Sequence, residues 1–298
     1  MIISWITSKA DLGSTALSKG GLSNLNPHVA DIKILDTTKT SLSLQVKVNF
    51  TNPTEYTAQI PYINIHLLNN GSIIGQGIVT DLNVTKGNNT NVLVNAVWDP
   101  YTLGGKKAQA IGRELLSQYI SGWNTTLTFK THRGSIPSQP SLGEALSKFE
   151  IEMPFPKLST PSNGDKEDDD DDEGNTAPHF IRDATFHLFS STATFTLVSP
   201  FRETDMYIEK LNATALYNHT EPVGKILYDL PFKVPPGISQ TPKLPVDWSL
   251  DSVGYDRLRE ALGGKLKLDA QGTIGIRLGN WREEVWYKGA GIGAKVTV

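Results

Sequence analysis

The sequence contains no cysteine among its 298 residues, which excludes disulfide bonds, CxxC redox chemistry, thiolate catalysis and cysteine-ligated zinc. No apolar run approaches the ~18–20 residues that a membrane-spanning helix needs, and the opening MIISWITSK lacks the basic region and cleavage site of a signal peptide. Charged residues make up 20% of the chain and the net charge is −3, which excludes a wholly disordered chain and a polybasic one. What remains is ordinary globular composition at a two-domain length.

The clearest boundary is the segment STPSNGDKEDDDDDEGNTAP at 159–178, which carries a net charge of −7 and leaves +4 for the rest of the chain. Because its charges repel one another, we expect an extended, disordered and solvated linker. A calcium site is the alternative, but the run lacks the Gly and Glu spacing of an EF-hand loop. The predicted organisation is an N-terminal extension (1–27), a first β-sandwich (28–158), the acidic linker (159–178) and a second β-sandwich (179–298).

The segments on either side of the linker are diverged copies of one unit. In each copy a proline is followed by a glycine after 22 or 24 positions and by a tryptophan after 45 or 48. The matched positions are Pro53, Gly75 and Trp98 in the first copy and Pro200, Gly224 and Trp248 in the second. This pattern indicates a repeat of about 120 residues, an array of domains rather than a solenoid. We expect the two tryptophans to be matched core anchors.

Within a copy, apolar and polar residues alternate with a period of two. Examples are SLSLQVKVNF (41–50), INIHLL (63–68) and WNTTLTFK (123–130). Such strands bury one face, as the antiparallel strands of a sandwich do. Asn70-Gly71 is a strong two-residue hairpin signal, because a type I′ turn needs positive φ at both positions.

A helical period interrupts each copy once, at 105–120 and at 251–262. We expect each helix to cover an open end or edge of its sandwich. An amphipathic membrane-binding helix is the alternative, although both segments carry few cations and a narrow apolar stripe.

The chain contains seven Asn-X-Ser/Thr sequons, more than chance provides, and most fall on polar strand faces or in turns. They are Asn49, Asn70, Asn83, Asn88, Asn124, Asn212 and Asn218. Glycan attachment needs such exposed positions in a secretory compartment. Polar strand faces favour Asn and Thr in any case, which is the alternative explanation. We expect a lumenal or extracellular location, with the anchor or signal outside this chain.

The sequence contains none of the GxSxG, HExxH or Walker motifs, and its histidines lack metal-ligand spacing. The glycines of 288–296 have no following helix to hold a pyrophosphate. In RLGNWREEVWYK (277–288) the cations are offset by two glutamates, which argues against nucleic-acid binding. We therefore predict no catalytic, cofactor or metal residues. The candidate contact surface is an exposed pair of Trp281 and Trp286, although the favoured interpretation is core packing of at least Trp286.

A strand that ends in Asn52-Pro53-Thr54, followed by Ile60-Pro61-Tyr62 and a Gly-rich hairpin, resembles the group-two late embryogenesis abundant (WHy) domain. The resemblance implies an immunoglobulin- or fibronectin-like sandwich. NPTEYTAQIPYINIHLLNNGSIIGQG, VNAVWDP, GRELLSQYISGWNTTLTFKTHRGSIP and FEIEMPFPKL resemble more closely a fungal membrane-protein family. Its members are often labelled "pre-rRNA processing protein" and are related to the yeast vacuolar protein that signals termination of autophagy.

The resemblance covers nearly all of 28–298 and implies the lumenal part of a protein with one transmembrane helix. No catalytic residue comes with it. In the second copy Ser199-Pro200 replaces Asn-Pro. The leading hypothesis is a non-enzymatic interaction or sensing module on the lumenal face of the vacuolar membrane, with an unidentified protein partner. The alternatives are a lipid or apolar-ligand carrier, a hydrolase on a sandwich scaffold, and the nucleolar pre-rRNA role that the label implies.

Overall fold

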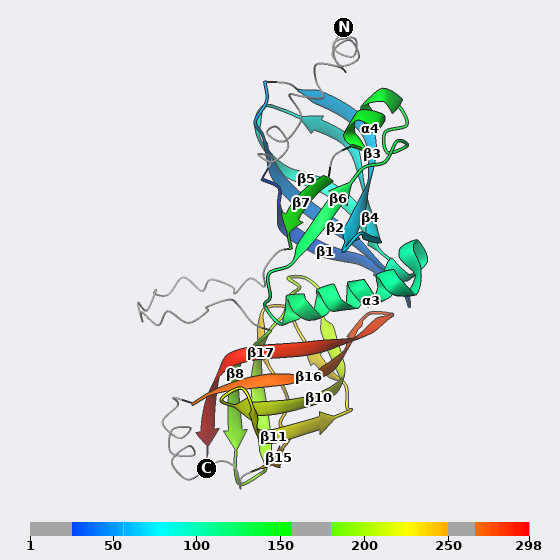
Figure 1. Cartoon of the computed structure of the whole chain (residues 1–298). Coiled ribbons are helices and arrows are strands. Elements are labelled where there is room, and N and C mark those ends of the chain that lie inside the picture. The colour runs from blue at the N-terminus through cyan, green and yellow to red at the C-terminus, as the bar shows by residue number, and fades with distance from the viewer. Residues whose placement is uncertain (1–25, 56, 149, 156–179, 250–265, 298) are drawn as a thin grey trace. The chain divides into compact units, whose positions relative to one another are not determined.

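The computed structural model describes residues 26–55, 57–148, 150–155, 180–249 and 266–297 (Figure 1). The chain divides into two units. Unit 1 comprises 1–112 and 125–156, and unit 2 comprises 113–124 and 157–298. Most of the predicted N-terminal extension, the whole acidic linker and the predicted helix at 251–262 lie outside the described residues.

Unit 1 is a curled antiparallel sheet of seven strands in the order β1-β2-β5-β4-β3-β6-β7. The strands are β1 (His28–Thr37), β2 (Leu42–Asn52), β3 (Ala58–Asn69), β4 (Ser72–Val84), β5 (Gly87–Trp98), β6 (Thr126–Lys130) and β7 (Glu150–Pro154). The predicted hairpin turn is confirmed: Asn70 and Gly71 have φ values of 46° and 71° and join β3 to β4.

The core of unit 1 lies where β3 and β4 meet the segment that leads into α4 (Pro140–Leu146), a short helix that the sequence analysis did not predict. Ile60, Ile63 and Val79 pack there with Ile136, which is completely buried. Of the five apolar residues that alternate along β2, only Leu42 is buried and the others are half-buried. The one-sided burial predicted for this strand is therefore weaker than expected.

Helix α3 (Pro100–Ile120) begins five residues before the predicted start. Asp99 caps its N-terminus, because the Thr102 N–H donates to Asp99 Oδ1 at 3.2 Å and Pro100 occupies the first helical position. Gly105, at φ 69° and ψ −162°, kinks the helix. The boundary between the units falls within α3, after Gly112, so its last eight residues belong to unit 2.

Unit 2 is a sheet of ten strands whose main path is β13-β9-β8-β17-β16-β10-β11-β15. The longer strands are β8 (Ile181–His187), β9 (Thr192–Val198), β10 (Met206–Tyr217), β11 (Glu221–Tyr228), β16 (Leu266–Leu278) and β17 (Trp281–Thr297). The short strands are β12 (Phe232–Val234), β13 (Ile238–Gln240), β14 (Leu244–Pro245) and β15 (Asp247–Trp248). Among the strand pairs described, only β8 with β17 is parallel.

The strand pairs of unit 2 form a closed ring. The segment from β13 to β15 pairs with β9 on one side, through β13 and β14, and with β11 on the other, through β15. The parallel pair of Gly293–Thr297 with Asp183–His187 joins the last strand of the chain to the first strand of the unit. The two curled sheets confirm the predicted tandem, mainly β architecture.

The glycine and tryptophan of each repeat are direct partners across neighbouring strands. Gly75 pairs with Trp98 between β4 and β5, and Gly224 pairs with Trp248 between β11 and β15. A Cβ on Gly75 would lie 2.8 Å from the Val97 carbonyl oxygen, and one on Gly224 would lie 3.3 Å from the Trp248 ring. Trp98 is buried, whereas Trp248 is half-buried and packs edge-on against Phe186 at 5.1 Å. The sequence spacing thus predicted a structural equivalence between the units.

Candidate functional site

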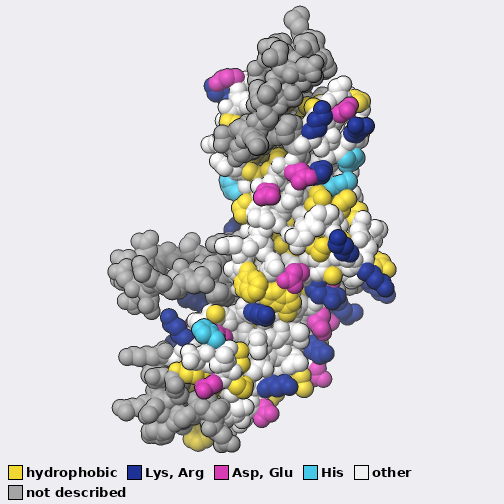
Figure 2. Space-filling view, viewed as in Figure 1, with side chains coloured by type: hydrophobic (Ala, Val, Ile, Leu, Met, Phe, Trp, Pro, Cys, Tyr) yellow, Lys and Arg dark blue, Asp and Glu magenta, His cyan; other side chains and the backbone are white. Residues whose placement is uncertain are grey.

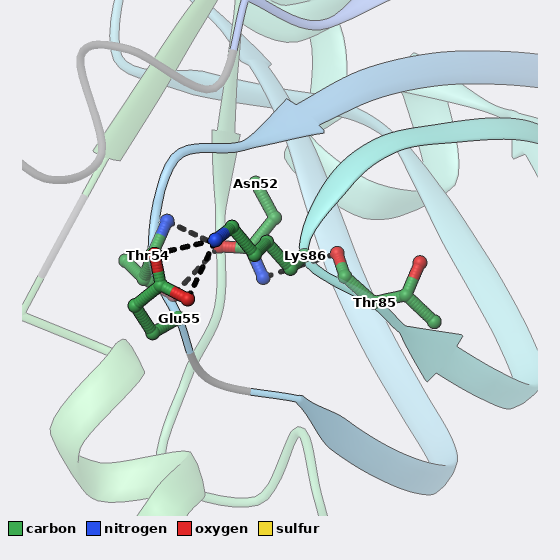
Figure 3. Close-up of polar contacts among 5 residues, drawn as sticks. All are labelled: Asn52, Thr54, Glu55, Thr85 and Lys86. Atoms are coloured by element: carbon green, nitrogen blue, oxygen red, sulfur yellow. Dashed lines mark hydrogen bonds and ion pairs between the residues drawn. The ribbon is translucent and has the colours of Figure 1, made fainter.

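The Asn-Pro-Thr motif of unit 1 ties together two loops at one end of the sheet (Figure 3). The backbone N–H and the hydroxyl of Thr54 both donate to Asn52 Oδ1, at 3.1 and 2.7 Å. Asn52 Nδ2 donates to the carbonyl oxygen of Thr85 at 3.2 Å. The Asn52 side chain therefore closes its own turn and also holds the start of the β4–β5 loop.

A second buried asparagine completes this cluster. Asn89 Oδ1 accepts from the backbone N–H and the hydroxyl of Thr85, at 2.8 and 3.2 Å. Its Nδ2 donates to the carbonyl oxygens of Thr85 and Gly87. Asn52 and Asn89 are each only 6% exposed, so their hydrogen bonds offset a large desolvation cost. Because both amides serve backbone groups, the cluster is a structural lock rather than a reaction centre.

The rim of this lock carries an exposed ion pair between Lys86 Nζ and Glu55 Oε1 at 2.6 Å (Figure 3). Both side chains are more than half exposed, so the pair adds little to stability.

In unit 2 the equivalent position holds Ser199, which is also buried. Its hydroxyl lies 3.2 Å from both the N–H and the carbonyl oxygen of Phe201 and makes no bond to a second loop among the described residues. The shorter side chain thus keeps the turn and loses the side-chain tie between loops, although the Ser199 N–H donates to the Gly237 carbonyl oxygen at 2.8 Å.

Two histidines stack on unit 1, with the His66 and His132 ring centroids 4.8 Å apart. His132 Nδ1 accepts the N–H of Gly134 at 3.1 Å, which leaves the proton of the neutral ring on Nε2. Burial lowers the pKa of His66, and the neighbouring His132 lowers it further. These rings support the loop that leads to the buried Ile136, and no third ligand joins them: no group of three or more His, Asp and Glu suited to a metal occurs among the described residues.

The C-terminal segment of α3 covers the edge of β17 in unit 2 through two buried serines. Ser117 Oγ accepts the N–H of Trp286 at 3.1 Å, and Ser121 Oγ accepts the N–H of Lys288 at 3.0 Å. Residues four apart on a helix rise ~6 Å, and residues two apart on a strand advance ~6.8 Å. The two hydroxyls therefore match two successive N–H groups on the strand edge.

Two further contacts hold the same helix segment against β17. The Arg113 Nε lies 2.8 Å from Glu283 Oε1, and Trp286 Nε1 donates to Glu114 Oε2 at 2.8 Å. The spacing of Ser117 and Ser121, four residues apart, is the only sequence signal for this contact with the edge of β17. In the sequence, however, the two serines look like ordinary polar positions on a helix.

The exposed pair predicted for Trp281 and Trp286 is wrong, because Trp281 is only 5% exposed. Trp281, Val285 and Tyr287 share the inner face of β17 and are buried, whereas Trp286 points outward. Period-two alternation along β17 would have separated these residues. Trp286 instead pairs with Trp123, at 5.1 Å between ring centroids, and Figure 2 shows hydrophobic side chains gathered where the end of α3 meets β17.

Trp123 was predicted to lie on a strand facing the core, and it is 48% exposed instead. It follows the end of α3 in a Schellman motif, with Gly122 at φ 76°. The Trp123 N–H bonds to the Gln118 carbonyl at 2.9 Å and the Gly122 N–H to the Tyr119 carbonyl at 3.1 Å. These two hydrogen bonds fix the backbone at Trp123.

The sequon asparagines differ in how their side chains are engaged. All except Asn49 are exposed, and Asn70 and Asn218 lie in hairpin turns at φ 46° and 48°. Asn49 Oδ1 accepts the N–H of Asn91 and its Nδ2 lies 3.3 Å from His28 Nε2, so Asn49 is half-buried and held at both ends.

The tyrosines with shifted pKa values are Tyr287, in the core of unit 2, and the half-buried Tyr119. Burial raises the pKa of Tyr119 to about 12, and it also raises the pKa of Tyr287. Both phenols stay protonated near neutral pH and are unsuited to act as general bases. Within the described part of the chain, no helix has the length and apolar character to span a membrane.

Two protein-family models match the chain, one in the first half and one in the second. Residues 25–144 match the Tag1-like fourth LEA-2 like domain, and residues 173–286 match the Tag1-like fifth LEA-2 like domain. A search of curated proteins found no match. A solved structure that aligns, the BSP domain of a biofilm associated protein, has 12% identity and a TM-score of 0.15, over 96% of this chain and 55% of that one. At that TM-score the likeness supports nothing about the fold. The two family matches fall on consecutive segments, and the chain is therefore similar to two LEA-2 like domains in tandem.

Proposed function

We propose that the chain is a lumen-facing interaction and sensing module without enzymatic activity, part of a fungal vacuolar membrane protein that acts in the termination of autophagy. The observation that carries the proposal is the tandem match to the fourth and fifth Tag1-like domains. A module repeated along a chain is suited to present surface rather than to build one reaction centre.

The buried asparagine and serine side chains already hydrogen-bond to backbone groups of the protein, which supports a non-enzymatic role. Asn52 and Asn89 bind backbone groups of their own loops, and Ser117 and Ser121 bind a strand edge. A hydroxyl or amide committed to a buried structural bond is unavailable to a substrate. These clusters are therefore best explained as parts of a rigid scaffold.

The sequons support the lumenal placement. Six of the seven asparagines are exposed, as glycan attachment requires, and they occur in both units.

Protease protection of the tagged full-length protein in isolated vacuoles tests the location. We expect this segment to resist protease in intact vacuoles and to be digested once detergent opens the membrane. Digestion without detergent would place the segment on the cytosolic face and contradict the proposal.

The role is tested by measuring autophagic flux in cells that carry the protein without residues 28–298. We expect flux to persist when autophagy should end, and a normal decline would argue against the role.

A second candidate, an apolar-ligand carrier, is favoured by the incomplete burial of apolar side chains on one face of the β2–β5 pair in unit 1. Leu44, Val46 and Val48 of β2 lie opposite Ala96, Val94 and Val92 of β5, and all except Ala96 are only half-buried. Native mass spectrometry of the gently extracted protein tests this candidate. A mass increment that organic extraction removes would support it, and an unliganded protein would count against it.

A further inference from the structure

We infer that Asn124 carries an N-linked glycan whose first sugar packs against the aromatic pair of Trp123 and Trp286. The inference rests on the lumenal location proposed above and adds a specific modification site to it.

The aromatic pair is held in place before any ligand binds. The Schellman motif fixes the backbone at Trp123, and the bond from Trp286 Nε1 to Glu114 fixes the Trp286 ring. Lys288 Nζ lies 5.5 Å from the centroid of the Trp286 ring. The pair therefore forms a preorganised apolar surface, to which Trp123 contributes a side chain that is 48% exposed.

Asn124 directly follows Trp123 and begins the sequon Asn124-Thr125-Thr126. Asn124 and Thr126 are exposed, and no hydrogen bond engages the Asn124 side chain among the described residues. Adjacent Cα atoms lie ~3.8 Å apart, so a sugar on Asn124 starts within reach of the aromatic pair.

Two of the other sequon side chains are already hydrogen-bonded. The Asn49 amide is held at both ends, and Asn88 Oδ1 accepts a bond from Thr51. Asn83 is exposed on β4, and its two neighbours in sequence, Leu82 and Val84, are not aromatic. Asn83 is therefore a matched control: an exposed sequon that does not follow an aromatic residue.

The chemistry of the sugar fits the surface. One face of an N-acetylglucosamine ring presents C–H groups, which pack on the flat apolar face of an indole, while the hydroxyls at the ring edge stay in water. Packing of this kind would cover aromatic surface that otherwise faces solvent.

The test compares the whole chain secreted from a fungal host with the same chain made in bacteria, where it carries no glycan. Glycopeptide mass spectrometry gives the occupancy of each sequon, and thermal unfolding is measured for Asn124→Gln, Asn83→Gln and Trp123→Leu. Trp123→Leu keeps an apolar contact after the helix end and removes the flat ring.

We expect Asn124 to be occupied and Asn124→Gln to lower the Tm of the secreted protein by about 2–4 °C, with no change in the bacterial protein. Asn83→Gln should shift the Tm less, and in the Trp123→Leu background Asn124→Gln should have no effect. An unoccupied Asn124 beside an occupied Asn83 would overturn the inference. Equal effects of the two Asn→Gln variants, or a protein bound across the aromatic pair, would also overturn it. The protease-protection result is independent of each of these outcomes.

Discussion

The two units follow the same order of strands, but among the described residues only unit 2 closes into a ring. β1, β2, β4, β3, β6 and β7 of unit 1 correspond to β8, β9, β11, β10, β16 and β17 of unit 2, and β5 corresponds to the segment from β13 to β15. The last strand has 5 residues in unit 1 and 17 in unit 2. The long strand continues past β16 and pairs with β8, and this pair closes the sheet of unit 2.

In the described part of unit 1, the two edge strands, β1 and β7, carry features that discourage pairing. β1 carries Asp31, Lys33 and Asp36 and has register shifts at Val29/Asp31 and Ile34/Asp36. β7 is short, carries two glutamates and ends in Pro154. Charges, irregular register and proline all discourage the pairing of an edge with another chain. The two copies of the repeat thus treat their edge strands differently: unit 2 pairs them with each other, and unit 1 carries residues that discourage pairing.

Substitutions in the first strand of each unit, β8 and β1, should give the largest difference in stability loss between the units. Phe186 of β8 is 3% exposed and packs against Phe195 and Trp248. We expect Phe186→Ala to destabilise unit 2 by about 3–5 kcal/mol. Ile32→Ala in the half-buried β1 should cost unit 1 markedly less. Urea unfolding with hydrogen exchange resolved by strand measures both, and equal losses would contradict a structural role for the closure.

Replacing Asn52, the residue before Pro53, tests whether the hydrogen-bonded cluster of Asn52 and Asn89 holds the two loops together. Asn52→Ser gives unit 1 the residue found at Ser199 and removes the donor to the Thr85 carbonyl. We expect a loss of about 1–3 kcal/mol, because the buried Asn52 amide and its hydrogen bond to the β4–β5 loop are lost. Lys86→Ala, which removes the exposed ion pair beside the lock, is the control and should change stability little. If both variants lose the same stability, the lock is not what holds these loops.

Removing one serine should expose the edge of β17. Ser117→Ala leaves the N–H of Trp286 without its acceptor, and we expect a cost of about 1 kcal/mol, partly offset by the higher helix propensity of alanine. Faster hydrogen exchange at Trp286 should accompany it. Ser147→Ala, at an exposed local bond to the Glu144 carbonyl, is the matched control. Unchanged exchange at Trp286 would show that water satisfies this edge.

The smallest expected effect is a pH dependence that arises in unit 1. The pKa of His66 is lowered in the folded chain, so the unfolded chain binds more protons below the ordinary histidine pKa of about 6.5. The stability of unit 1 should therefore fall as the pH drops below that value and level off below the folded pKa. His66→Gln should flatten this part of the profile in urea titrations between pH 7 and 5. A slope that survives in His66→Gln would trace the dependence to other groups.

Local patterns predicted much of the fold. Asn70-Gly71 located a hairpin, and the spacing of glycine and tryptophan predicted partners that the strands bring together in both units. The closing pair of β8 and β17 has no local signal, because parallel pairing joins residues about 110 positions apart. The serines that cover β17 were missed for the same reason: a helix face reveals its polarity in sequence but not the strand that it meets.

The division of α3 between the units has a practical consequence for dissecting the molecule. A protease cut in the acidic segment would leave Arg113–Asn124 on the N-terminal piece, although these twelve residues are part of the downstream unit. The C-terminal piece alone would then present the bare N–H groups of Trp286 and Lys288, a ready template for self-association. Studies of the downstream domain in isolation should supply that stretch as a peptide or by permuting the chain.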